Sequence, residues 1–222
     1  FSNNAFGYKS LTSNTTGRNN TASGTESLNS NTTGSDNTAS GAYSLGTNTT
    51  GSFNTAYGYQ SLKFNTTGND NTAFGYNSLS FNTTGSNNTA YGQQSLLYNT
   101  TGIYNTASGA YSLGANTTGS NNTAYGIYSL LSNTTGSNNT AFGYSAKAST
   151  GNATNQTVIG HEATGQADNS VVLGNDNVTA VYMGEDSGAT VYAGGLNLGG
   201  TAITANAAEL NYLDGVTSSI QT

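Results

Sequence analysis

The chain contains neither cysteine nor proline. The absence of cysteine excludes a disulfide framework and a thiolate metal site. The absence of proline leaves every residue with a backbone N–H that can pair with a neighbouring strand. Disordered low-complexity chains usually carry proline or blocks of charge, and this chain has neither. Despite its polar, glycine-rich composition, the sequence therefore favours continuous backbone pairing over a disordered linker.

Charged residues are scarce as well. They make up 6% of the 222 residues, only four of them are Lys or Arg, and the net charge is −6. Clustered basic residues neutralise the phosphates of nucleic acids and acidic membranes, so we expect neither partner. No apolar run approaches the length of a membrane-spanning helix, and we expect no membrane insertion. The chain begins at Phe1 without an initiator Met, which predicts a part of a longer protein.

The chain does contain a seventeen-residue repeat, N-T-A-x-G-x-x-S-L-x-x-N-T-T-G-x-x. One glycine recurs at Gly7, Gly24, Gly41, Gly58, Gly75, Gly92, Gly109, Gly126 and Gly143. One leucine recurs at Leu11, Leu28, Leu45, Leu62, Leu79, Leu96, Leu113 and Leu130. This unit is too short for a helix pair or a propeller blade but suits one coil of a β-solenoid. We therefore expect an all-β fold, a parallel β-solenoid of 17-residue coils over residues 1–150.

Each coil is expected to contain two short strands, T-A-x-G and x-S-L-x-x, with the glycine bending the chain after the first strand and N-T-T-G closing the coil. Parallel stacking separates coils by about 4.8 Å and aligns identical side chains in columns. The leucine column then predicts a core. The asparagine columns that run from Asn14 to Asn133 and from Asn20 to Asn139 predict ladders of hydrogen-bonded amides.

The N-T-T segments allow a second interpretation, because each is also an acceptor sequence for N-glycosylation. The asparagines concerned are Asn14, Asn31, Asn48, Asn65, Asn82, Asn99, Asn116 and Asn133. In a eukaryotic secretory pathway they would place sugars along one side of a filament. In a phage or a bacterium they would simply form turns.

The apolar content of one coil is small: an Ala, a Leu and sometimes an aromatic residue. Such a coil buries little apolar surface against the entropy of ordering its backbone, which predicts an oligomer with chains side by side about a common axis. Aromatic residues recur seven positions apart, as in Tyr57 with Phe64 and Phe74 with Phe81. This pairing favours packing in a core or interface. The alternative is an exposed ladder in which Tyr57, Tyr91 and Tyr125 stack on glycans.

The pattern changes after residue 150. Gly160 and Gly174 lie fourteen residues apart, each after two branched apolar residues, so residues 151–200 are expected to form shorter coils and further strands. Residues 201–222 are expected to form a connector with a short helix over 207–213. Asn206 and Glu209 supply its N-terminal capping box, and Gly215 ends it.

The N-S-V-V-L-G segment at 169–174 resembles the head repeat of trimeric autotransporter adhesins, and the seventeen-residue unit resembles an expanded form in bacteriophage tail fibres and related bacterial surface proteins. The resemblance covers about residues 3–200. It implies a left-handed β-roll and a homotrimer in a virion tail fibre or on a cell surface. It also implies the shaft of a fibre that presents a receptor-binding tip for host attachment.

The sequence offers little for chemistry. His161, Glu162 and Asp168 could be drawn as a metal or acid–base cluster, but His161 is the only histidine and no second strong ligand has zinc spacing. We expect no metal, no cofactor and no enzymatic activity. Besides the fibre shaft, two functions remain open: a glycan-binding or glycosylated extracellular filament, and, more distantly, ice binding through threonine ladders.

Overall fold

The computed structural model describes residues 2–181, 196–198 and 201–203. The chain divides into two units after Thr179. Among the described residues every regular element is a strand, as expected for an all-β protein. The first unit contains β1 Asn4–Phe6, β2 Thr21–Ser23, β3 Thr38–Ser40, β4 Thr55–Tyr57, β5 Thr72–Phe74, β6 Thr89–Tyr91, β7 Thr106–Ser108, β8 Thr123–Tyr125, β9 Thr140–Phe142, β10 Gln156–Ile159 and β11 Ser170–Leu173.

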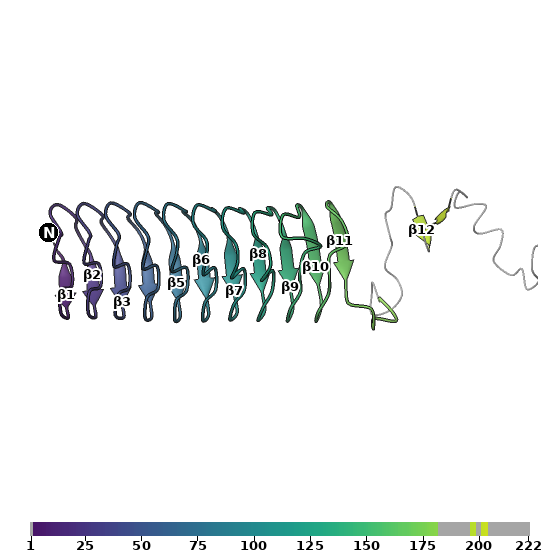
Figure 1. Ribbon diagram of the computed structural model, residues 1–222, viewed down its shortest axis with the longest axis horizontal. Helices are drawn as coiled ribbons and strands as arrows, with labels where there is room; N and C mark the ends of the chain where they lie inside the picture. The colour runs from purple at the N-terminus through teal and green to yellow at the C-terminus, as the bar shows by residue number, and fades with distance from the viewer. Residues whose placement is uncertain (1, 182–195, 199–200, 204–222) are drawn as a thin grey trace, which may run out of the picture. The chain divides into compact units, whose positions relative to one another are not determined.

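These strands form one 11-stranded parallel sheet in chain order, with each strand paired to the next (Figure 1). Strand partners from β1 to β10 are seventeen residues apart, as in Ala56 with Ala73 and Val158 with Ala141. The last step shortens to fourteen residues, since Val158 pairs with Val172. The predicted parallel β-solenoid of 17-residue coils is therefore confirmed, and it continues as far as β10.

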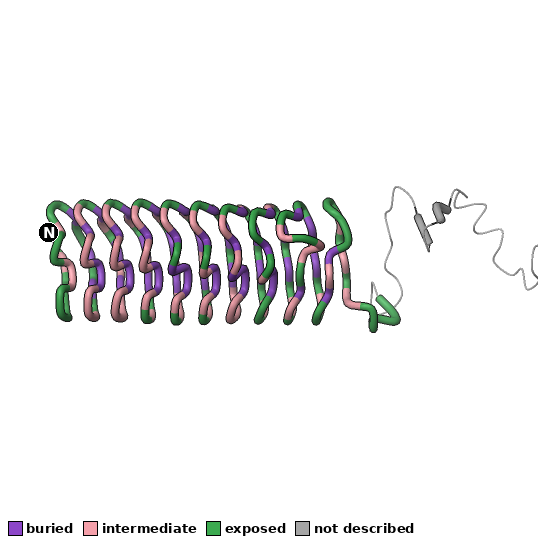
Figure 2. The backbone as a smooth tube through the Cα atoms, in the orientation of Figure 1, coloured by how far each residue is buried: buried purple, intermediate pink, exposed green. Residues whose placement is uncertain are grey.

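The interior of the coil stack is narrow and fully enclosed. The central alanine of each strand from Ala22 to Ala141 and each leucine from Leu28 to Leu130 is at most 1% exposed. The buried positions recur at the same place in successive coils (Figure 2). The alanine and leucine columns together form one hydrophobic cluster. One chain therefore removes its own aliphatic columns from water without help from a second copy.

The expected second strand, x-S-L-x-x, is wrong. That segment is a run of turns in all eight coils that carry the leucine. Leu28 and Glu26 have φ angles of 48° and 56°, which lie in the left-handed region that an extended strand does not visit. Asn31 N–H closes the turn by donating to the Leu28 carbonyl at 3.1 Å. The left-handed conformation strains the leucine backbone, but the turn directs its side chain into the core, where burial offsets the strain.

A third left-handed position follows N-T-T-G in each coil, and Asn or Asp fills most of its copies, as at Asn87 (φ 59°) and Asp70 (φ 55°). These side chains tolerate the conformation better than others do. Phe53 and Tyr104 are exceptions, with φ angles of 60° and 57°. Both rings are also exposed, at 61% and 56%. They keep a strained backbone without core burial to offset it.

We therefore expect Phe53→Asn to stabilise the protein by about 1 kcal/mol, because asparagine lowers the cost of the left-handed conformation and little buried area is lost. Chemical denaturation of the variant and of the parent chain measures the difference. Tyr104→Asn should give a gain of the same sign. Equal or lower stability in both variants would show that the rings stabilise the coil through contacts that outweigh the backbone strain.

The predicted asparagine ladders are confirmed. In the first, Asn82 donates from Nδ2 to Asn65 Oδ1 at 2.7 Å and to the Gly85 carbonyl at 2.8 Å. In the second, Asn71 donates to Asn54 Oδ1 at 3.1 Å and to the Gly85 carbonyl at 2.9 Å. All four asparagines are fully buried. Each amide satisfies buried carbonyls while joining successive coils.

The second ladder ends at Gln156, which occupies the next place in that column and is fully buried. Its N–H donates to Asn139 Oδ1 at 3.0 Å, and its Oε1 accepts from the Ser149 N–H at 3.0 Å. The backbone N–H of Gln156 thus pairs with the last asparagine of the ladder, while its longer side chain reaches Ser149, where the coils change length.

The second unit contains β12 Leu196–Leu198 and β13 Thr201–Ile203, which pair antiparallel. β13 falls within 201–222, the segment for which the sequence predicted a connector. The helix expected over 207–213, with its caps at Asn206, Glu209 and Gly215, lies outside the described residues.

Candidate functional site

Aromatic side chains line the outside of the coil stack in columns. One column is the outward-facing third residue of β1 to β9, continued by Ile159 and Leu173. Tyr57, Phe74 and Tyr91 stack in succession there. Their ring centroids are 5.0 and 4.8 Å apart, and their planes differ by 1° and 5°. Tyr125 and Phe142 form a second such pair in the same column at 4.9 Å. We call this the strand-face column.

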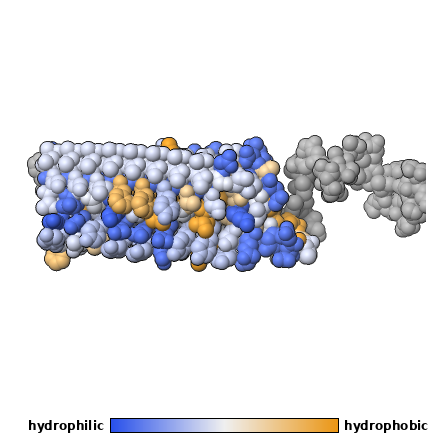
Figure 3. Space-filling view, in the orientation of Figure 1, coloured by the Kyte–Doolittle hydropathy of each residue, from blue (hydrophilic) through white to orange (hydrophobic). Residues whose placement is uncertain are grey.

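A separate column lies seven residues further along each coil. Phe64, Phe81 and Tyr98 stack there with centroids 5.1 and 5.4 Å apart. The sequence paired Tyr57 with Phe64, but each ring instead stacks on its counterpart one coil away, Tyr57 on Phe74 and Phe64 on Phe81. The identical seventeen-residue register decides this pairing. Apolar side chains gather in patches between polar surface on the face shown in Figure 3.

The aromatic residues are not in the core of the chain. Tyr57, Tyr91 and Tyr125, the candidates for glycan stacking, are 46%, 48% and 54% exposed. The ring faces in the strand-face column nevertheless differ in how far a ligand can reach them, because neighbouring rings that stack cover one or both faces. Phe74 has a ring against each face. Tyr91 and Tyr125 each have one stacked partner in the column, on opposite sides, so only their remaining faces can receive a ligand.

The structure places seven of the eight N-T-T asparagines in the interior. Asn31, Asn48, Asn65, Asn82, Asn99, Asn116 and Asn133 are at most 2% exposed, and Asn14 in the first coil is half-buried. Each buried Nδ2 donates to the preceding asparagine and to a glycine carbonyl, so both of its hydrogens are used. A glycan attached to Nδ2 would displace one hydrogen and find no space. The folded coils can therefore carry no glycan at these seven positions.

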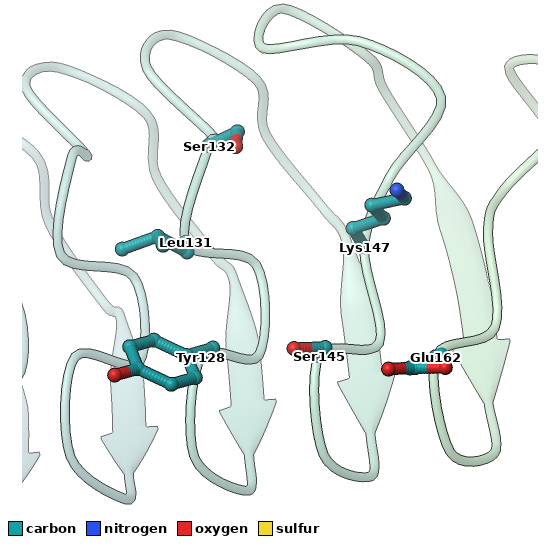
Figure 4. Close-up of a pocket in the computed structure, with 6 residues that line it drawn as sticks. All are labelled: Tyr128, Leu131, Ser132, Ser145, Lys147 and Glu162. Atoms are coloured by element: carbon teal, nitrogen blue, oxygen red, sulfur yellow. The ribbon is translucent and has the colours of Figure 1, made fainter.

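An open groove of about 570 Å³ lies where the coils change length. Tyr128, Ser145 and Glu162 follow one another along one of its sides, on successive coils (Figure 4). Leu131, Ser132 and Lys147 complete the lining. Lys147 takes the place of the repeated leucine and is exposed, which removes apolar filling from the last coil. The groove thus results from the loss of the repeat pattern.

His161, Glu162 and Asp168 do not form a three-membered cluster. His161 Nδ1 lies 3.7 Å from Glu162 Oε2, and both side chains are largely exposed. Asp168 instead accepts the Thr154 N–H at 2.8 Å, and this hydrogen bond lowers the pKa of its carboxyl. Its contribution to stability is therefore present above the unfolded-state pKa and is lost as the pH falls through the lower folded-state value. In the described part of the chain no group of three His, Cys, Asp or Glu residues could hold a metal ion.

The threonine columns do not form the broad face that ice binding would require. The threonine that begins each strand from β2 to β9 faces outward beside the strand-face column, whose aromatic rings interrupt the surface. The threonine after each N-T-T asparagine uses its hydroxyl internally, as Thr66 does on the Thr83 carbonyl at 2.9 Å. The two sets of hydroxyl groups are thus unequal and separated along the coil.

Comparisons with known proteins give no match at any level. No family model matches the chain, and searches of curated proteins and of solved structures find none either. Within the described residues there is no helix long and apolar enough to cross a bilayer. The coil stack and its surface are therefore the features of the chain that bear on its function.

Proposed function

We propose that this chain is a structural shaft of a homotrimeric fibre, in a phage tail fibre or a surface adhesin outside the cell, which holds a receptor-binding tip for host attachment. One observation carries the proposal: ten successive steps of the same parallel pairing without a break. At about 4.8 Å per step, the first unit is about 48 Å long. Such stacks resist bending because every coil is hydrogen-bonded to its neighbours. A shaft of this kind needs no catalytic group or cofactor.

The column of Phe64, Phe81 and Tyr98, which is separate from the strand face, supports the homotrimer. The residues at this position carry no charge in any seventeen-residue coil. The rings stack on one another, and Phe81 and Tyr98 are 41% and 52% exposed. Cores of protein interfaces are depleted in charge and enriched in aromatic residues. The molar mass of the purified chain in solution tests the trimer, and a monomeric mass would contradict it.

A modular shaft should tolerate the loss of one repeat. We expect deletion of residues 38–54, which rejoins Asn37 to Thr55 and restores the N-T-A motif, to leave the coil stack folded and about 4.8 Å shorter. Low-resolution imaging or small-angle scattering measures the length, and circular dichroism checks the fold. Deletion of nine residues from the same segment is the matched control, since it breaks the register and should abolish folding. If the seventeen-residue deletion also prevented assembly, the modular shaft would be untenable.

A further inference from the structure

The strand-face column contains one place where a single ring is missing between two rings. Ser108 in β7 pairs with Tyr91 in β6 and with Tyr125 in β8. Two steps of about 4.8 Å place these tyrosines about 10 Å apart. Neighbouring rings in this column are 4.8 to 5.0 Å apart. The space above Ser108, which we call the Ser108 gap, therefore matches one ring of the same thickness.

The two tyrosines that flank the gap, Tyr91 and Tyr125, are each stacked on a second ring on the side away from the gap. Tyr91 stacks on Phe74 at 4.8 Å with planes 5° apart, and Tyr125 stacks on Phe142 at 4.9 Å with planes 5° apart. Their free faces point toward each other across Ser108. A ligand ring would therefore meet two pre-positioned aromatic faces with little ordering cost. By contrast, two serines, Ser23 and Ser40, separate Phe6 from Tyr57 in the column, so a single ring there could not contact both aromatic faces.

The rest of the seventh coil leaves room beside the gap. Ser108 is followed by the small residues Gly109 and Ala110. The flanking coils carry the larger Gln93 and Ile127 at the position of Ala110. Ile127 is 47% exposed, and Gln93 Nε2 donates to the Tyr111 hydroxyl at 3.3 Å. The recessed surface over Ser108 thus continues over Gly109 and Ala110 at the bend after β7, and a ligand larger than one ring can extend along it.

Polarity decides which ring fits. No charged residue occurs between Asp70 and Lys147, so nothing beside the gap would pair with an ionic ligand. The hydroxyl groups of Thr106, Ser108 and Thr123 face outward here and make no hydrogen bond to another described residue. The gap thus combines two apolar faces with a rim of free hydroxyls. A neutral pyranose presents C–H groups on its two faces and hydroxyls around its edge, so it can both stack and hydrogen-bond to the rim, whereas an aromatic hydrocarbon ring could only stack.

We propose that the Ser108 gap binds a neutral hexopyranose of a cell-surface or capsular glycan between Tyr91 and Tyr125. This goes beyond the shaft function, since it gives the side of the shaft a lateral contact with the host surface that is independent of any tip. It also narrows glycan stacking to two of the three tyrosines, because the ring that Tyr57 faces, Phe6, is three strands away.

The experiment uses the full chain with methyl β-glucopyranoside and cellotriose as neutral probes, and an N-acetylneuraminic acid glycoside and p-cresol as alternatives. Binding is followed by saturation-transfer NMR and titration. Ser108→Tyr completes the column without disturbing it and should weaken binding of the neutral probes at least tenfold, as should Tyr125→Ala. Ile159→Tyr is the matched control, because it adds a ring next to Phe142 in the same column, outside the gap and without enclosing a second one, and should leave binding unchanged.

Three results would overturn the proposal. The first is no binding of either neutral probe, and the second is equal binding by the Ser108→Tyr variant. The third is tighter binding of p-cresol, which would assign the gap to an aromatic side chain of a protein. A change in molar mass on Ser108→Tyr would likewise contradict it, because this surface would then be an interface between copies. The shaft function is judged separately by fibre length and mass, which Ser108→Tyr should leave as they are.

Discussion

Gly75→Ala is expected to cost about 3 to 5 kcal/mol of folding free energy. Gly75 has a φ of 131°, a region that side chains other than glycine rarely enter and that costs on the order of 1–3 kcal/mol. An added Cβ would also lie 2.6 Å from the Gly92 carbonyl oxygen and 2.7 Å from its carbon. Both are backbone atoms of the next coil, so relief requires separating the two coils. Overpacking of this kind adds roughly 1–3 kcal/mol.

Gly46→Ala is the matched control. At Gly46 the φ is not positive, and the nearest atom to an added Cβ is the Tyr43 carbonyl oxygen at 3.2 Å. Other coils carry Thr12, Asn29 or Lys63 at the same place. We expect a change of less than about 1 kcal/mol, partly offset by the reduced freedom of the unfolded chain. Urea denaturation of both variants gives the comparison. Similar losses for the two substitutions would show that the repeated glycines are not required by coil spacing.

Asn116→Asp is expected to destabilise the protein by about 3 kcal/mol or more at neutral pH. Asn116 Nδ2 donates to Asn99 Oδ1 at 2.8 Å and to the Gly119 carbonyl at 3.0 Å, while its Oδ1 accepts from Asn133 at 2.8 Å. The side chain is fully buried. A carboxylate there would be a buried charge that faces two acceptors instead of donating to them. The substitution changes one atom and almost no volume, so packing stays constant.

The pH dependence of this variant follows from the same contacts. Burial and the two acceptors favour the protonated acid, so its pKa in the folded state is raised above the unfolded value. The part of the loss that is due to the charge should therefore return as the pH falls through the raised pKa, and be fully recovered below about 4, where the unfolded carboxyl is protonated as well. A smaller loss should remain, because the protonated acid has one donor for the two acceptors. Denaturation at pH 7 and at pH 4 measures this. A pH-independent loss would mean that the ladder tolerates a charge.

Asn121→Asp in the same coil provides the control. Asn121 is exposed, has a φ of 57° and occupies a column in which Asp36 and Asp70 occur naturally. We expect a change within about 0.5 kcal/mol at either pH. The contrast separates the buried ladder from the general effect of adding a negative charge to a chain that already carries −6.

The sequence by itself determined the period, the parallel stacking and the asparagine ladders. A strict seventeen-residue repeat of this length can bury its Ala and Leu only by placing each copy on the last, so Ala56 must meet Ala73 and Asn82 must meet Asn65. The same periodicity identified Gly75 and its counterparts as positions that need glycine. These features depend on local geometry and on identity between copies, both of which can be read directly from the amino-acid sequence.

The tertiary structure alone decided the path of the chain within a coil. The segment around Leu79 has the composition of a strand, yet Asn77 and Leu79 have φ angles of 54° and 51°. The left-handed turns are favourable only because they direct Leu79 toward the alanine column. The position of the aromatics was decided in the same way. Tyr57 pairs with Phe74 one coil away, because a fixed step of about 4.8 Å brings like positions closer than positions seven residues apart within a coil.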